Sequence, residues 1–243
     1  MPENFHLSIV IPAYKEQGRI HKILDAIIKY EEKHDFSVET IVVIDGTPDN
    51  TKESADKYLG KVKNLRIIDR KENKGKGFTV REGVLAAKGD WILFTDADNS
   101  TPVHQVDKLL EFSKDYQVLI GSRRANGGHE AKKQSIVRIV GSQMLNWIIQ
   151  ALAVPGIKDT QCGFKLFEGR AAKEIFNRQT FDRWSFDIEI LAIARHLGYK
   201  ILEVGIVWYD DPHSTVNPIK DGIRMVRDSW QVRRNMIRKL YSR

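Results

Sequence analysis

The chain has 243 residues, of which 42% are hydrophobic and 29% charged, a composition typical of a folded domain with a substantial core. Its one cysteine, Cys162, excludes an internal disulfide, and the sequence has neither a segment resembling a signal peptide nor an uncharged apolar run of about eighteen residues that could span a bilayer. The single cysteine and the lack of these two patterns lead us to expect a cytoplasmic protein. The formal net charge is +7, but no nucleic-acid-reading motif accompanies it, so we expect no nucleic-acid partner.

Short apolar runs alternate with helical patterns through the first half of the chain. Runs with the composition of buried strands are found at 7–11, 38–44, 65–68, 91–95 and 118–120, and helical patterns lie between them at 20–28, 77–87 and 102–112. Strands that alternate with helices require crossover connections. The sequence therefore predicts an α/β fold with a mostly parallel central sheet flanked by helices.

The second half of the chain is less regular. The stretch 136–154 is predicted to be an apolar helix interrupted by polar side chains, which fits either a core helix or one wall of an apolar acceptor groove. A helix is predicted at 185–197 and a strand at 201–208. Asn217 and Pro218 then supply an N-cap and a first-turn proline for an amphipathic helix. We expect one catalytic domain, 1–216, followed by a C-terminal basic amphipathic helix, 217–243.

This C-terminal helix carries most of the net charge. Between Lys220 and Arg243 there are eight Lys or Arg residues and two Asp residues, so the segment holds six of the seven surplus positive charges. A basic amphipathic helix suits the surface of an anionic membrane, and we expect the protein to associate peripherally with a cytoplasmic membrane face. A solvated helix with a polar outer face fits the same pattern.

Polar and flexible residues follow four consecutive strands. The most informative are Asp96 and Asp98, directly after the strand 91–95. Open α/β sheets bind ligands outside the carboxyl ends of their strands, where one carboxylate can face a ribose while the other ligates a divalent metal that carries a diphosphate. With the loops 12–16, 45–51 and 73–77, they predict a pocket for a base, a ribose and a diphosphate. The glycines of 73–77 match neither the dinucleotide-binding fingerprint nor a P-loop.

These segments resemble a known family. The stretches 9–16, 45–49, 73–77 and 96–98 are similar to the family 2 glycosyltransferases of GT-A fold. The segments 121–123, 159–167 and 184–189 are similar to the polyprenyl-phosphate glycosyltransferases, most of all to the dolichyl-phosphate β-glucosyltransferases. The resemblance covers nearly the whole chain. It implies an inverting, metal-dependent transfer of a hexose, foremost glucose, from a UDP-sugar to dolichyl or polyprenyl phosphate, with Mg²⁺ or Mn²⁺ on the diphosphate.

The resemblance also implies roles for single residues. Asp96 and Asp98 would engage the ribose and the metal, and Asp159 would orient the acceptor or the sugar, because an ionised phosphate needs no strong base. A turn aspartate fits position 159 as well. Catalytic roles are expected for Asp98, Arg123 and Asp159, and ligand contacts for Pro12, Tyr14, Glu16, Val43, Asp45, Lys76, Asp96, Ala97, Arg138, Ser142 and Lys165.

Three further side chains have less specific predictions. Lys165 fits either a phosphate contact or a solvated strand position. Cys162 is expected to be a packed small residue rather than a nucleophile. Asp187 and Glu189 lie two residues apart on a predicted helix, so they should not share a face.

The chain departs from the family pattern at several points. It has Ile44-Asp45 where many members have two adjacent aspartates, and Ser214-Thr215-Val216 where a Ser-Lys-Val block is usual. The segment 99–101 differs from that of the dolichyl-phosphate mannose synthases, which favours a UDP-sugar over GDP-mannose.

Three alternative functions stay open. They are a GDP-mannose-using mannose synthase, a non-catalytic nucleotide-sugar-binding protein of the same fold, and a sugar nucleotidyltransferase. The last would carry a Gly-rich, Arg-containing loop after its first strand, where this chain has Pro-Ala-Tyr-Lys-Glu at 12–16.

Overall fold

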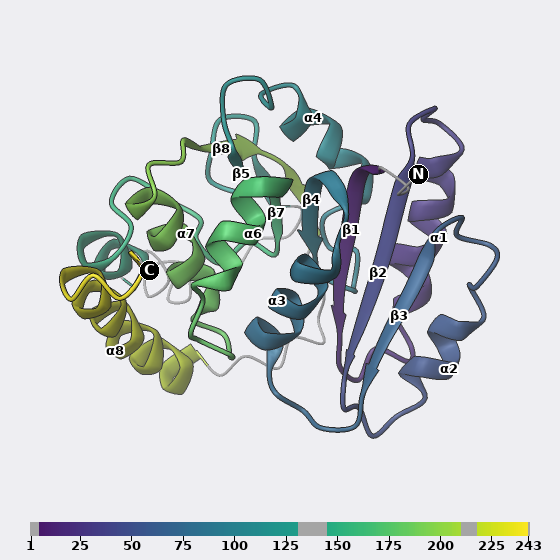
Figure 1. The fold of residues 1–243 in the computed structure, drawn as a ribbon, viewed down its shortest axis with the longest axis horizontal. Helices are drawn as coiled ribbons and strands as arrows, with labels where there is room; N and C mark the ends of the chain where they lie inside the picture. Colours follow the sequence, from purple (N-terminus) through teal and green to yellow (C-terminus); the bar gives the residue numbers. More distant parts are fainter. Residues whose placement is uncertain (1–4, 131–144, 210–217, 243) are drawn as a thin grey trace.

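The computed structural model describes residues 5–130, 145–209 and 218–242, and its centre is a seven-stranded sheet (Figure 1). The strand order is β3-β2-β1-β4-β7-β5-β8. All neighbours are parallel except on the two sides of β7, which runs antiparallel to both β4 and β5. The sheet strands are β1 (Phe5–Ala13), β2 (Val38–Asp45), β3 (Leu65–Arg70), β4 (Gly89–Thr95), β5 (Val118–Ser122), β7 (Phe164–Glu168) and β8 (Ile201–Gly205).

Helices cover both faces of the sheet, as the alternating strand and helix patterns predicted. The helices are α1 (Ile20–Glu31), α2 (Thr51–Asp56), α3 (Lys76–Ala86), the 3₁₀ turn η1 (Val103–Gln105), α4 (Val106–Leu110), α6 (Gly169–Asn177), α7 (Phe186–His196) and α8 (Pro218–Ile237). Residues 145–152 are also helical. Together these elements confirm the predicted α/β fold with its mostly parallel sheet.

The two faces of the sheet build two separate hydrophobic clusters. Because side chains alternate along a strand, Ile41 and Val43 of β2 pack on the side of α3, α6 and α7, whereas Val42 and Ile44 pack on the side of α1 and α4. All eight residues of β2 are buried, as expected for a parallel strand that is covered on both faces. The sheet is therefore a rigid platform for the loops at its edges.

Two elements of the second half differ from the prediction. The predicted strand 201–208 is divided at Ile206, whose amide donates to the carbonyl of Ser122 and whose carbonyl accepts from His129. After this break β9 (Val207–Trp208) leaves the large sheet and pairs with β6 (His129–Glu130). β7 and α6 were not predicted as elements, because the apolar residues of β7 are interrupted by Lys165.

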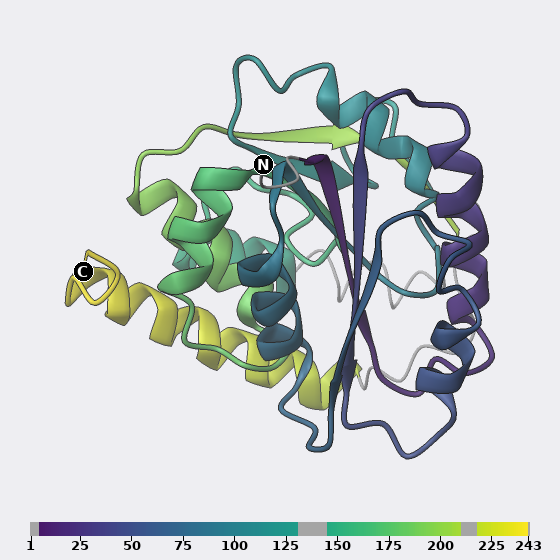
Figure 2. The same cartoon turned by 45° about the vertical axis from the view of Figure 1, so that its right-hand side comes forward.

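The C-terminal helix α8 packs along α7, at the end of the molecule opposite α1 and α2 (Figure 1; Figure 2). Val232 and Tyr241 are fully buried and belong to the cluster that contains α7. Among the helices described, none is long and apolar enough to cross a membrane.

Candidate active site

Asp96 and Asp98 lie at the carboxyl end of β4, where the sequence predicted them. The amide of Asp96 donates to the carbonyl of Gly163, 3.1 Å away, because β7 begins beside the end of β4. The Asp98 carboxylate accepts from the amide of Ser100 at 2.9 Å. Burial raises the pKa of Asp98, and the charge of Asp96 raises it further. The charges of the two carboxylates therefore repel each other, as expected for two ligands of a cation.

Position 163 requires a glycine because it lies so close to Asp96. A Cβ atom at Gly163 would lie 1.9 Å from Oδ2 of Asp96, so no larger residue fits without displacing that carboxylate. The sequence prediction did not include this glycine. The contact depends on β7, which crosses back antiparallel from a part of the chain far from β4.

Glu16 adds a third carboxylate to this edge of the sheet. Its side chain pairs with Arg19, with Nη2 to Oε1 at 2.7 Å, and its amide donates to the hydroxyl of Thr51. Burial raises the pKa of Glu16 to about 7; the Arg19 pair opposes this shift, and the charges of Asp98 and Asp96 add to it. Within the described residues, no three His, Cys, Asp or Glu side chains converge tightly enough to hold a metal by themselves.

Asp45 organises the glycine loop between β3 and α3. Its carboxylate accepts from the amides of Lys74 at 2.8 Å and Gly75 at 2.9 Å, and it pairs with the guanidinium of Arg70. Gly75 has φ of +99°, a conformation that favours glycine. Asp45, which was expected to contact the nucleoside, is thus buried, and its carboxylate oxygens bond to protein groups that shape the loop.

Lys76, the first residue of α3, brings a positive charge to the carboxylates. Its Nζ lies 2.7 Å from Oδ1 of Asp96 and 5.3 Å from the centre of the Trp184 ring. Burial alone would lower the pKa of Lys76, but Asp96 and Asp187 raise it above the ordinary value. The site therefore holds a lysine that stays charged next to the predicted metal ligands.

Lys165 is buried in the core and forms an ion pair with Asp187. Its ammonium also donates to the carbonyl of Cys162 at 2.6 Å. The sequence allowed either a phosphate contact or a solvated strand position for this lysine, and the prediction of a solvated position is therefore wrong. Glu189 points elsewhere, to Thr180 and Tyr241, which confirms that it and Asp187 occupy different faces of α7.

The thiol of Cys162 lies in the protein interior. Burial raises its pKa to about 12, which is the opposite of what an activated nucleophile requires. Its environment agrees with the prediction of a packed residue.

Arg123 and Asp159 form a second charged unit at the same edge of the sheet. Nε and Nη2 of Arg123 donate to the two oxygens of Asp159 at 2.8 and 2.7 Å, and the Arg123 amide donates to Oδ2 at 2.9 Å. Although burial acts in the other direction, these contacts hold the pKa of the Asp159 carboxyl below its usual value. The Arg123 guanidinium lies 5.1 Å from the centre of the Trp208 ring. Glu203 of β8 accepts from the Asp159 amide at 2.8 Å, which was not predicted.

The remaining predicted residues are dispersed. Tyr14 is exposed, Pro12 is half-buried and Ala97 is buried, all at the same sheet edge. Val43 is fully buried within the core, where it faces Gly83 of α3. The predictions for Arg138, Ser142 and the block 214–216 lie outside the described residues.

Comparison with known proteins gives a consistent family. Residues 8–176 match the sequence profile described as "Glycosyl transferase family 2". The chain is 35% identical over 244 residues to a dolichyl-phosphate β-glucosyltransferase of Dictyostelium discoideum, covering 95% of this chain and 75% of that protein. It is 34% identical over 241 residues to the dolichyl-phosphate β-glucosyltransferase of Homo sapiens, covering 93% and 74%.

Solved structures with the same fold are more distant in sequence. Mannosyl-3-phosphoglycerate synthase from Rubrobacter xylanophilus superposes with a TM-score of 0.71 at 15% identity, covering 97% of this chain and 74% of that one. Glucosyl-3-phosphoglycerate synthase from Mycobacterium tuberculosis, in complex with Mn²⁺, UDP and glucosyl-3-phosphoglycerate, gives 0.68 at 17% identity, covering 94% and 80%. These similarities show the GT-A fold.

Proposed function

The chain belongs to glycosyl transferase family 2, and on that basis we propose that it transfers glucose from a UDP-sugar to dolichyl or polyprenyl phosphate with inversion at the anomeric carbon. The observation that carries this proposal is the set of charged side chains at one sheet edge: the Asp96 and Asp98 pair with Lys76, and the Arg123 and Asp159 pair. The first suits a nucleotide diphosphate and the second an acceptor phosphate.

A divalent cation fits the first group. Mg²⁺ is usually held by one or two carboxylates together with the phosphate oxygens of its substrate and water, so two aspartates suffice. Asp96 and Asp98 supply them. Burial raises the pKa of Asp98 and repulsion from Asp96 raises it further, and a cation would relieve that repulsion. When bound, Mg²⁺ or Mn²⁺ would stabilise the negative charge on the departing diphosphate. The mycobacterial glucosyl-3-phosphoglycerate synthase with Mn²⁺ and UDP supports this proposal by analogy of fold.

The nucleotide would lie across the loops that follow β1 to β4. Tyr14 and Glu16 follow β1, and the glycine loop held by Asp45 follows β3. Lys76 would contribute a positive charge to the diphosphate beside the cation. The two relatives are both named glucosyltransferases, and this chain covers about three quarters of each. Their names support glucose as the transferred sugar.

The transfer step needs few protein groups. An oxygen of the acceptor phosphate forms a bond to the anomeric carbon while the bond from that carbon to the UDP oxygen breaks, which inverts the configuration and releases UDP. The phosphate is ionised near neutral pH, so no base has to remove a proton. Arg123 would bind and orient the acceptor phosphate. Asp159, whose oxygens accept three hydrogen bonds from Arg123, would fix the guanidinium in place.

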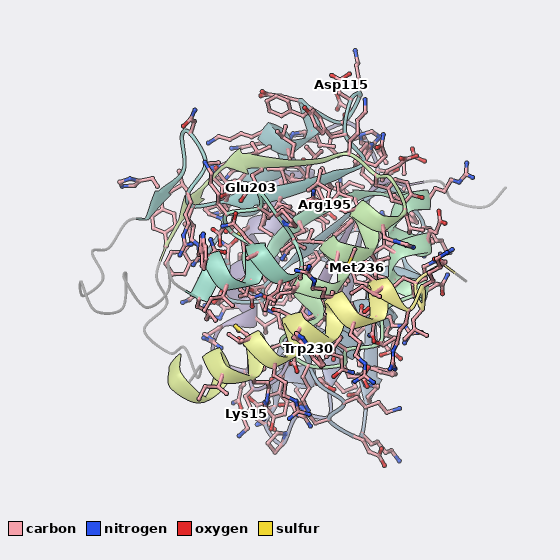
Figure 3. The ribbon with its side chains drawn as sticks, turned by 90° about the vertical axis from the view of Figure 1, so that its left-hand side faces the viewer. Lys15, Asp115, Arg195, Glu203, Trp230 and Met236 are labelled. Carbon is pink, nitrogen blue, oxygen red and sulfur yellow. The ribbon has the colours of Figure 1, made fainter. Side chains whose placement is uncertain are left out.

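A membrane surface would supply the lipid acceptor. α8 exposes three apolar side chains at intervals of seven residues, Ile223, Trp230 and Ile237, with Leu240 just beyond its end. Exposed basic residues surround them: Arg224, Arg227, Arg233, Arg234, Arg238 and Lys239. In Figure 3, α8 runs across the face turned towards the viewer. We propose that this surface associates peripherally with the anionic cytoplasmic face of a membrane.

Transfer of a labelled sugar into the organic phase tests the function. The purified protein receives dolichyl phosphate, Mg²⁺ or Mn²⁺, and in parallel UDP-glucose, UDP-N-acetylglucosamine or GDP-mannose. We expect lipid-linked label from UDP-glucose, and its loss when a chelator is added. Label from GDP-mannose alone would establish a mannose synthase instead. No lipid label from any donor, with nucleotide bound, would point to a binding protein.

A further inference from the structure

Trp184 lies beside the charged centre of the site and has no assigned role. It belongs to the segment 178–185 between α6 and α7, and 38% of its surface is exposed. Its ring centre is 5.3 Å from Nζ of Lys76, within the range of a cation–π contact. A second ring, that of Phe94, lies 5.4 Å from the same nitrogen but is fully buried. Of these two rings, that of Trp184 is the one that is partly exposed to solvent.

Trp184 and Lys76 are held in one structural unit. The amide of Phe78 in α3 donates to the carbonyl of Asp182 at 3.0 Å. A Cβ atom at Gly75 would lie 2.6 Å from that carbonyl oxygen, and one at Gly77 would lie 2.6 Å from the carbonyl oxygen of Phe181. The backbone before Trp184 is thus packed directly on the loop that carries Lys76, so the two side chains keep their relative position.

The residue after Trp184 is anchored on the other side. The hydroxyl of Ser185 donates to Asp228 of α8 at 2.5 Å. Trp184 therefore stands between two fixed points, the glycine loop and α8. A large aromatic side chain that is half exposed, yet immobilised in this way, suits the positioning of a neighbouring group.

The environment of Lys76 explains why such a contact matters. The Lys76 side chain is only 20% exposed, and its Nζ pairs with Oδ1 of Asp96 at 2.7 Å. The negative face of an indole ring stabilises an ammonium group most when water is excluded. The ring thus helps to hold the Lys76 ammonium beside Asp96.

We infer that Trp184 is a positioning residue of the donor site, which acts by holding the Lys76 ammonium beside Asp96, where the diphosphate of a nucleotide donor would lie. This role rests on the proposed function. It separates Trp184 from groups that bind the nucleoside and its first phosphate, because a lysine held beside Asp96 would act on the charge of the second phosphate, which UDP carries and UMP lacks.

Calorimetric titration with UDP and with UMP in the presence of Mg²⁺ tests this role. Trp184→Ala should weaken UDP binding by roughly 3- to 30-fold, the range of a desolvated cation–π contact, and should leave UMP binding within about twofold. Trp184→Phe, which keeps an aromatic face, should recover most of the UDP affinity. Phe112→Ala is the matched control, because Phe112 has a similar exposure of 39% but lies before β5, at the opposite edge of the sheet.

A double variant shows whether Trp184 acts through the lysine. In a Lys76→Met background, Trp184→Ala should cause no further loss of UDP affinity, because the group that it positions is absent. An equal loss in that background, or an equal weakening of UDP and UMP, would mean that Trp184 touches the ligand directly and would overturn the inference. Unchanged UDP binding by Trp184→Ala would also overturn it while the proposed function stood. If the wild-type protein failed to bind UDP, the proposed function would fail together with this role.

Discussion

At the scale of single residues, a substitution of Asp98 can distinguish a catalytic role of its carboxylate from a structural one. Burial and the charge of Asp96 raise its pKa, so the ionised carboxylate destabilises the folded protein. The same negative charge would bind the proposed cation. Asp98→Asn keeps the shape of the side chain and removes the charge. We expect transfer to fall by about 100-fold or more, because a cation contributes several kcal/mol to the transition state.

The fold should tolerate the same change. The melting temperature of Asp98→Asn should equal or exceed that of the wild type, since the repulsion from Asp96 is relieved. Metal-dependent transfer and thermal unfolding are measured on one preparation. Asp115→Asn is the control, because Asp115 is exposed at the opposite end of the molecule from Lys15 (Figure 3). Undiminished transfer by Asp98→Asn would contradict the assignment.

Gly163 allows a test of how precisely Asp96 must be placed. A methyl group at this position would lie within 1.9 Å of Oδ2 of Asp96, so Gly163→Ala must displace the carboxylate or the start of β7. We expect a loss of about 1–3 kcal/mol in the free energy of unfolding and a weaker binding of UDP with Mg²⁺. Urea unfolding and calorimetric titration measure the two effects.

A second glycine provides the comparison. In Gly222→Ala, a substitution within α8, the new methyl group would lie 3.7 Å from Cδ2 of Leu145, an ordinary contact and the one within 4 Å among the described residues. Because alanine favours a helix more than glycine does, this variant should be as stable as the wild type or more so. Equal behaviour of the two variants would show that the Asp96 carboxylate is free to move.

The residues of the site were predictable where their position follows from a strand end. Asp96, Asp98 and Glu16 follow parallel strands directly, so an apolar run and the rule for open sheets suffice to group them. The contacts of Gly163 and Trp184 were not predictable in this way. Both depend on segments that reach the site from distant parts of the chain, and no local pattern in the sequence reports that approach.

At the scale of elements, the segment 178–185 connects three parts of the protein through Glu189 of α7. The Glu189 carboxylate accepts from the amides of Thr180 and Phe181 at 2.9 and 2.8 Å and from the hydroxyl of Tyr241 at 2.8 Å. Glu189→Ala leaves these buried donors without partners. We expect a loss of about 3 kcal/mol in the free energy of unfolding.

Tyr241→Phe dissects the same network. It removes one hydroxyl and leaves the two amide bonds of Glu189, so its cost should be about 1 kcal/mol. Urea unfolding of both variants measures the difference. Equal costs would show that the network stabilises the contact of the chain end with α7 and not the segment 178–185.

The elements of the first half were more predictable than those of the second. Apolar strands with helices between them give a clear pattern up to β5. The antiparallel strand β7 has no such signal, because its second residue, Lys165, is charged and is compensated by Asp187 from α7. The division of β8 from β9 depends on hydrogen bonds of Ile206 to two other segments, which the continuous apolar run 201–208 conceals.

At the scale of the whole molecule, the surface of α8 decides how the protein meets a lipid acceptor. The sequence predicted a basic amphipathic helix from charge and spacing, but the separation of the chain into 1–216 and 217–243 stays a prediction. The inner side of α8 is part of the core, with Val232 fully buried, and so is Tyr241 just beyond the end of the helix. Removal of the helix would therefore expose apolar side chains of α7, so exposed positions are the better choice for substitution.

Trp230→Ser and Ile237→Ser test the membrane surface without disturbing the core. Each removes an exposed apolar side chain, and we expect each to weaken binding to vesicles that contain anionic lipid by roughly tenfold, the value of one large side chain withdrawn from water. Binding of the wild type should itself weaken as salt is raised, because the surrounding arginines act by charge. Sedimentation with vesicles of neutral and of anionic lipid measures both effects.

Leu59→Ser is the matched control for these two variants. Leu59 is 53% exposed and Trp230 55%, but Leu59 lies beyond α2, at the other end of the molecule from α8 (Figure 1). If apolar exposure anywhere on the surface were enough for binding, Leu59→Ser would weaken it as much as Trp230→Ser does. If Trp230→Ser and Ile237→Ser weaken vesicle binding, Leu59→Ser does not, and binding falls as salt is raised, then the exposed apolar side chains and the arginines of α8 form one binding surface. Equal effects of the three substitutions would instead leave α8 as a solvated helix.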